Sequence, residues 1–140
     1  MKSSPGRIVF ISLLFYFAFL CTLSGKAQNI ANFNGKWSYS SDRTSFLLVL
    51  TQKQSVLSGT HCSTMAGGNK IDCFLDATDI SITGTVTDSN LVILTFKSFF
   101  SETSGRATLR KISPTQIEWT IIEEPGGEFY LPATAVLFKK

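Results

Sequence analysis

The feature that most limits the fold is a series of short segments rich in β-branched and aromatic residues, separated by turn residues, from residue 35 to residue 140. None of this region has the 3.6-residue apolar spacing of an amphipathic helix. The alternation predicts strands at these ranges: 35–41, 44–52, 55–64, 70–76, 80–88, 91–100, 105–112, 116–124 and 133–139. Turn residues such as Gly67-Gly68 and Pro125-Gly126-Gly127 separate them.

The connections are too short to hold the crossover helix of a parallel sheet, so we predict an all-β, antiparallel, up-and-down meander of eight or nine strands. A meander has two unpaired edges, and closure into a small barrel removes them. A flattened β-sandwich is the alternative fold, because two segments are apolar on both faces. In a barrel these segments would place apolar side chains outside, namely Leu47, Val49, Val92 and Leu94. An apolar exterior indicates a protein partner or a homo-oligomer.

The segment 1–28 has the pattern of a secretory signal peptide. Lys2 and Arg7 precede an apolar run from Ile8 to Leu23, which is shorter than a membrane-spanning helix. We predict cleavage after Ala27 or Gln28, which leaves residues 29–140 as one domain, secreted or periplasmic, with no membrane span. The alternatives are an uncleaved membrane anchor and a lipoprotein modified at Cys21. Leu20 stands where a lipoprotein signal carries a small residue.

Charge and hydrophobicity exclude two classes of protein. Lys2, Arg7 and Lys26 precede Asn29, so 13 − 3 = 10 of the Lys and Arg residues remain against 10 Asp and Glu. A neutral domain lacks the positive field that binds a phosphate backbone, and we expect no nucleic-acid partner. Hydrophobic residues make up 44% of the chain and charged residues 16%, which excludes intrinsic disorder.

Two cysteines remain after cleavage, Cys62 and Cys73, and an exported protein meets an oxidising compartment. The Gly67-Gly68 pair between them predicts a hairpin turn, because glycine adopts positive φ without strain. Pairing outward from this turn places Ala66 opposite Asn69 and Cys62 opposite Cys73. We therefore predict a disulfide rather than a redox pair or metal site, since the spacing is not C-x-x-C and the chain has a single histidine.

Gly35-Lys36-Trp37 opens the first predicted strand with a G-x-W pattern that resembles the start of the calycin barrels, which include lipocalins, fatty-acid-binding proteins and avidins. The stretch from Leu57 to His61 is similar to an avidin strand, Trp119 falls where avidins carry a late Trp, and residues 133–140 resemble their closing strand. The resemblance implies a closed barrel in which Trp37 plugs one end and the other end is an open mouth. It implies no specific ligand.

No motif of a hydrolase, P-loop or dinucleotide site is present, and we predict neither catalytic residues nor a metal or cofactor. His61 is the one strong candidate for a catalytic base. Its neighbour Cys62 is expected to be oxidised in a disulfide, so it is not available as a nucleophile. The adjacent carboxylates Glu123 and Glu124 should point to opposite faces of a strand.

Two groups of residues are candidates for binding. A ligand in the barrel mouth requires apolar walls with a few polar groups, for which the candidates are Trp37, Tyr39, His61, Ser63, Phe96 and Trp119. The alternative is that these side chains simply fill a small barrel. An interface is predicted in the last long turn, where two aromatic residues stand near two acids: Phe129, Tyr130, Glu123 and Glu124. Its alternative is a solvated turn whose aromatics fold back on the barrel.

The sequence thus predicts a secreted or periplasmic binding protein without catalysis, with a small hydrophobic ligand in the barrel mouth. The alternative is a protein-binding inhibitor or immunity-type protein that uses its loops and exposed apolar strands. A structural role in a cell-envelope assembly is a third option.

Overall fold

Along most strands buried apolar residues alternate with exposed ones, which is the pattern of a barrel wall. The computed structural model describes residues 29–140 except Asp88. The strands, in chain order, are β1 (Gly35–Ser40), β2 (Ser45–Lys53), β3 (Val56–Met65), β4 (Lys70–Cys73), β5 (Ile82–Val86), β6 (Leu91–Phe96), β7 (Gly105–Ser113), β8 (Gln116–Glu123) and β9 (Thr134–Lys139). A short 3₁₀ turn, Ala66–Gly68, joins β3 to β4.

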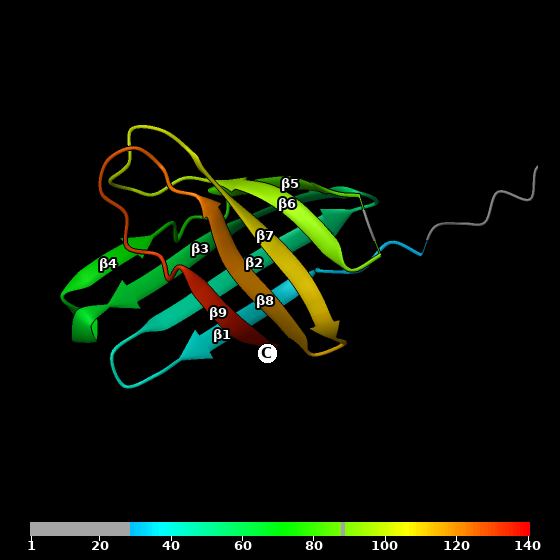
Figure 1. The fold of residues 1–140 in the computed structure, drawn as a ribbon, viewed down its shortest axis with the longest axis horizontal. Helices are drawn as coiled ribbons and strands as arrows, with labels where there is room; N and C mark the ends of the chain where they lie inside the picture. Colours follow the sequence, from blue (N-terminus) through cyan, green and yellow to red (C-terminus); the bar gives the residue numbers. More distant parts are fainter. Residues whose placement is uncertain (1–28, 88) are drawn as a thin grey trace, which may run out of the picture.

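The strands form one antiparallel sheet in the order β2-β1-β9-β8-β7-β6-β5-β3, and pairing of β2 with β3 closes it into an eight-stranded barrel (Figure 1). The ninth strand, β4, pairs only with the end of β3. The predicted all-β meander closed into a small barrel is confirmed, and the flattened sandwich is not the fold. Among the strands of the described residues, β4 alone lies outside the ring.

Three predicted strands are three or four residues shorter in the structure: 70–76, 80–88, which is observed as Ile82–Val86, and 91–100. At the end of the last of these, side chains take backbone donors that a neighbouring strand would otherwise bind. The segment predicted to extend to residue 100 leaves the sheet after Phe96. There the N–H of Phe99 donates to Asp72, and the N–H of Phe100 donates to the Ser98 hydroxyl. The segment predicted at 70–76 ends at Cys73.

The expected outward positions are partly wrong. Val92 and Leu94 are buried, and Ile93 between them faces outward. The register explains this, because Val92 pairs with Leu109 and Leu94 with Ala107, both of which point into the core. The other two expected outward residues, Leu47 and Val49, are half-buried.

The hairpin between β3 and β4 contains the disulfide. Cys62 lies directly opposite Cys73 in the register, and the two form a disulfide. Gly67 and Gly68 have φ angles of 68° and 96°, as the predicted turn requires. Strand pairing begins one position farther from the turn than expected, at Met65 and Lys70, because Ala66 belongs to the 3₁₀ turn.

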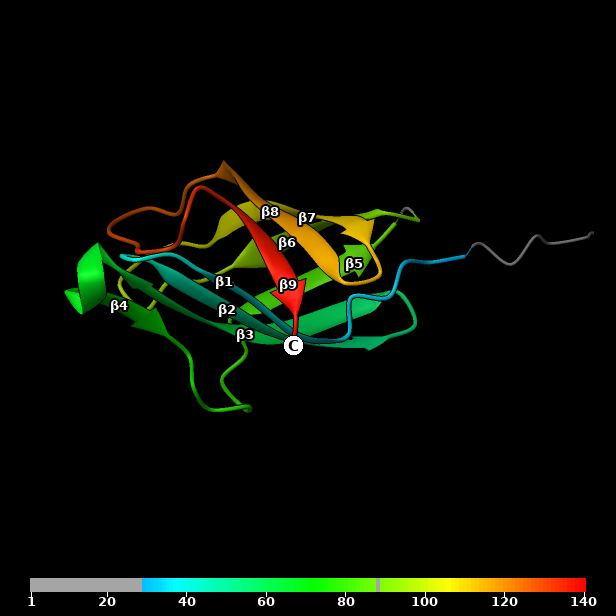
Figure 2. The same ribbon diagram turned by 90° about the horizontal axis from the view of Figure 1, so that it is seen from below.

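The two ends of the barrel differ. We call the mouth the end that contains the β3–β4 turn, the β6–β7 loop (97–104) and the β8–β9 loop (124–133) (Figures 1 and 2). The β2–β3 and β7–β8 turns lie at the opposite end (Figure 1), and Asn29, the first described residue, lines a hollow there with Pro114 of the β7–β8 turn. The core occupies the space between the two ends.

Candidate functional site

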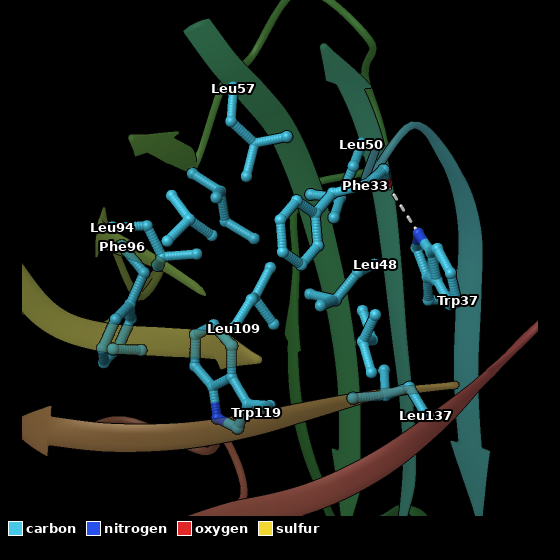
Figure 3. Packing of buried hydrophobic residues seen from close by; sticks show 14 of the residues in the cluster. Phe33, Trp37, Leu48, Leu50, Leu57, Leu94, Phe96, Leu109, Trp119 and Leu137 are labelled. Atoms are coloured by element: carbon cyan, nitrogen blue, oxygen red, sulfur yellow. Dashed lines mark hydrogen bonds between the residues drawn. The ribbon is translucent and has the colours of Figure 1, made fainter. Parts of the chain in front are cut away.

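Apolar side chains fill the interior of the barrel. Trp37 and Trp119 are both fully buried, and Figure 3 shows both among the packed side chains. Trp119 makes T-shaped contacts with the rings of Phe46 and Phe96 at centroid distances of 5.2 and 5.4 Å. The indole N–H of Trp119 donates to the Pro132 carbonyl. Three of the candidate wall residues, Trp37, Phe96 and Trp119, thus belong to the packed core, which is the alternative that the sequence left open.

The end opposite the mouth is closed over Trp37. Its indole N–H donates to the carbonyl of Phe33, whose ring packs in the core (Figure 3). The ammonium groups of Lys111 and Lys139 each lie 5.4 Å from the centroid of the Trp37 ring. Desolvation and the nearby charge of Lys139 lower the pKa of Lys111. Trp37 therefore lies at one end of the barrel, where the calycin resemblance places it.

A buried carboxylate lies at the other end, on β4. Asp72 is fully buried and accepts four hydrogen bonds: from the backbone N–H groups of Phe99 (2.9 Å) and Tyr130 (3.2 Å), from the Ser98 hydroxyl (2.5 Å) and from His61 (3.4 Å). Burial acts to raise the pKa of Asp72, but these hydrogen bonds outweigh it and lower the pKa from 3.8 to about 2. The carboxylate thus connects β3, β4 and two loops.

His61 lies between Asp72 and Ser81. Its Nε2 is 3.4 Å from an Asp72 oxygen, and its Nδ1 is 2.8 Å from the Ser81 hydroxyl, which also accepts the backbone N–H of His61. The residue types are those of a catalytic triad, but all three side chains are buried and Ser81 is 2% exposed. A substrate carbonyl cannot reach this hydroxyl in the described conformation, so the arrangement positions β3, β4 and the start of β5.

Ser63, another candidate, follows His61 by two residues and is the next inward-facing residue of β3 toward the mouth. Its hydroxyl is buried and has no hydrogen-bond partner among the described residues. A buried hydroxyl without a partner costs about 1–3 kcal/mol, so this position favours a bound water or a polar ligand atom.

The Asp72 hydrogen bonds hold a row of aromatic rings at the mouth. Neighbouring rings in this row, Phe74, Phe99, Phe100 and Tyr130, have centroids 6.2, 5.5 and 5.0 Å apart. Phe99 is 69% exposed and Phe100 is 45% exposed. We call these four residues the aromatic row. Exposed rings on hydrogen-bonded backbone are suited to contact a partner, because little conformational entropy is lost on binding.

A pocket of about 560 Å³ opens beside the aromatic row, between the β8–β9 loop and the tip of the β3–β4 hairpin. Its lining combines apolar and charged residues: Met65, Lys70, Ile121, Ile122, Glu123, Glu124, Phe129, Tyr130, Leu131 and Ala133. We call it the mouth pocket. The structure thus brings the four predicted interface residues together in one pocket, whereas Trp37, Phe96 and Trp119 lie elsewhere. Tyr39 is half-buried against the core.

Charged groups fix the orientation of Tyr130 in this pocket. Its hydroxyl donates to Glu128 at 2.5 Å, and the Lys70 ammonium lies 5.0 Å from its ring centroid. The hydrogen bond to Glu128 raises the pKa of Tyr130, as does desolvation. Glu123 forms an exposed ion pair with Arg106 at 3.7 Å. Phe129 packs partly against the core, so one aromatic of this loop folds back on the barrel.

Comparison with protein-family models, curated proteins and solved structures finds no match to this chain. The resemblance to calycins therefore extends to the small antiparallel barrel and does not establish a family. Among the described residues, no helix is long and apolar enough to cross a membrane. The same residues contain no cluster of three metal-ligating side chains.

Proposed function

We propose that this is a non-catalytic binding protein that recognises a partner protein at the mouth of its barrel. The observation that carries the proposal is the hydrogen bonding of Asp72 to both flanking loops, beside which Phe99 and Phe100 project into solvent. The filled interior around Trp119 supports a surface site rather than an internal one. Aromatic anchors of this kind contribute most of the binding energy in many interfaces.

A photo-crosslinking experiment tests this proposal. Phe99 is replaced by p-benzoylphenylalanine in the exported protein, and the producing cells are irradiated. The protein adducts that form are compared with those from the same replacement at Phe138. Phe138 is a matched control, since it is 52% exposed and lies on β9 away from the mouth. We expect one dominant protein adduct from position 99 only. Equal adducts from both positions, or none from position 99, would contradict the proposal.

A second candidate, a small hydrophobic ligand, is favoured by the mouth pocket itself. Its volume of about 560 Å³ lies in the range of small-molecule sites, and Met65, Ile121 and Phe129 give it apolar walls. Ser63 is two residues before Met65 on the same inward row and offers a buried hydroxyl without a described partner.

Titration with the fluorescent probe 1-anilinonaphthalene-8-sulfonate distinguishes this candidate. We expect saturable fluorescence that Ala133→Trp abolishes, because Ala133 lines the pocket, and that Thr134→Trp leaves unchanged. If the two variants bind the probe equally, the mouth pocket is not its site and the ligand candidate fails.

A further inference from the structure

Basic residues gather at the end of the barrel opposite the mouth, which we call the basic end. Strand order places six of the ten described Lys and Arg residues there: Lys36, Lys53, Arg110, Lys111, Lys139 and Lys140. Glu118 is the one acidic residue in the described strands of this half. Asp76 and Asp79 belong to the β4–β5 loop, whose Ala77 and Ile80 lie against Thr51 and Ser58 on the barrel wall, and Asp88 falls outside the described residues. At the mouth four basic residues (Arg43, Lys70, Lys97 and Arg106) face six acidic ones: Asp42, Asp72, Glu102, Glu123, Glu124 and Glu128. Basic residues therefore outnumber acidic ones at the basic end, and acidic residues outnumber basic ones at the mouth.

Among the described residues, no ion pair involves a basic group of this end, and the nearest acidic residue on the strands is Glu118, opposite Arg110 in the register. The described residues form two ion pairs, His61–Asp72 and Arg106–Glu123, and both lie in the half of the barrel nearer the mouth. Lys111 and Lys139 instead share the Trp37 ring, which brings two like charges together. Such a cluster attracts an anionic surface.

Exposed apolar side chains lie among these basic groups. Ile30, Val56 and Ile112 are 38, 60 and 49% exposed, and all three belong to this end. Ile30 and Ile112 line a shared hollow with Lys111. Lysine heads mixed with exposed aliphatic groups match the headgroup region of a membrane, which accepts both charge and apolar surface.

We propose that the basic end docks on an anionic phospholipid bilayer and thereby points the mouth away from the membrane. Asn29, the first described residue, lines the same hollow, so the chain enters the barrel on this face. The exposed Ile and Val side chains favour a membrane over a nucleic acid, because a phosphate backbone would not contact them. This binding is independent of the partner proposed for the mouth.

Vesicle co-sedimentation tests the proposal with the exported protein, purified as the cell releases it. The probes are vesicles of phosphatidylcholine alone and vesicles of phosphatidylcholine mixed with phosphatidylglycerol. We expect binding only to the anionic vesicles, and a decrease as salt is raised. The variant Lys36→Glu/Lys53→Glu should weaken binding about tenfold or more, since each lysine near an anionic surface adds to the attraction.

The matched control changes the net charge by the same amount, but at the mouth. Arg43→Glu/Lys97→Glu alters two exposed residues and leaves Lys70 on Tyr130 in place. We expect it to bind anionic vesicles like the unmodified protein. Equal loss in both double variants would show that net charge alone acts, and would overturn the oriented docking. Equal binding to neutral vesicles, no vesicle binding, or binding to a DNA duplex in place of vesicles would overturn it as well.

Discussion

Asp72 shows how one residue can organise a barrel end. At the mouth β4 and the β6–β7 loop do not pair as strands, and the Asp72 carboxylate bonds to that loop at Phe99 and Ser98. It also accepts the N–H of Tyr130 from the β8–β9 loop. A carboxylate with several donors is held in its charged form although it is buried. The position of the aromatic row therefore depends on the ionisation of this side chain.

Stability should consequently fall in acid. The folded pKa of Asp72, about 2, lies below the ordinary 3.8, so the carboxylate stabilises the fold fully above about pH 4 and loses this effect as the pH falls toward 2. The shift corresponds to about 2 kcal/mol. Urea unfolding between pH 6 and pH 2 measures this loss. Asp72→Asn should be less stable at pH 7 and should lack this acid-dependent loss, whereas the exposed Asp42→Asn should behave like the unmodified protein.

Asp72 and the exposed Phe99 were not candidates in the sequence, for a physical reason. Asp72 stands between Ile71 and Cys73 in a short strand, where an acidic residue usually faces solvent. Its burial is decided by two loops that are 27 and 58 residues distant in the sequence. His61 and Ser63 were candidates; His61 belongs to this network and Ser63 lies next to it on β3, but as ligand contacts both remain predictions.

At the scale of elements, the β3–β4 hairpin was the most predictable unit. Local turn chemistry sets its register, and both the Gly67-Gly68 turn and the Cys62–Cys73 pair are present. The strand ends at residues 74–76 and 97–100 were less predictable, because their apolar residues are compatible with a sheet. At 97–100 the side chains of Asp72 and Ser98 take the N–H groups of Phe99 and Phe100. After Cys73 the N–H of Phe74 still donates to the His61 carbonyl, but no further strand pairing follows.

Removing the hairpin disulfide should destabilise the protein moderately. Its loop is short, with a sequence separation of 11, so loop closure corresponds to about 2–3 kcal/mol. Cys62→Ser/Cys73→Ser should lower the free energy of unfolding by this amount in urea. Under non-reducing conditions, intact mass after alkylation should detect no free thiol in the exported protein; labelling of either Cys62 or Cys73 would contradict the disulfide.

For the whole molecule, the packing of aromatic rings across the barrel decides how much space the interior leaves for a ligand. Phe46 on β2 and Phe96 on β6 both contact Trp119 on β8, so this one ring joins strands from several sides of the wall. An eight-stranded barrel has an interior about as large as its own side chains, and here they occupy it. For this reason both surfaces that we propose for binding are placed at the ends of the barrel.

Trp119→Ala should therefore destabilise the fold strongly. It removes a fully buried indole and leaves a cavity, which typically costs about 3–5 kcal/mol. Trp119→Phe should cost less, because the ring contacts with Phe46 are partly kept. Urea denaturation of both variants checks the expectation, and a change below about 1 kcal/mol in Trp119→Ala would show that the core around it is not close-packed.

The sequence by itself determined the strand pattern and the hairpin with its disulfide, because alternation, turn chemistry and short-range pairing are local properties. The place of Trp37 at one end of the barrel came only from the resemblance to calycins. Tertiary structure alone decided which apolar residues face inward, which polar side chains are buried together, and how charge is distributed. Composition counts ten basic and ten acidic residues from Asn29 onward, but only the up-and-down path of the strands places most of the basic residues at one end. Burial and electric field depend on distances between residues that are far apart in the chain.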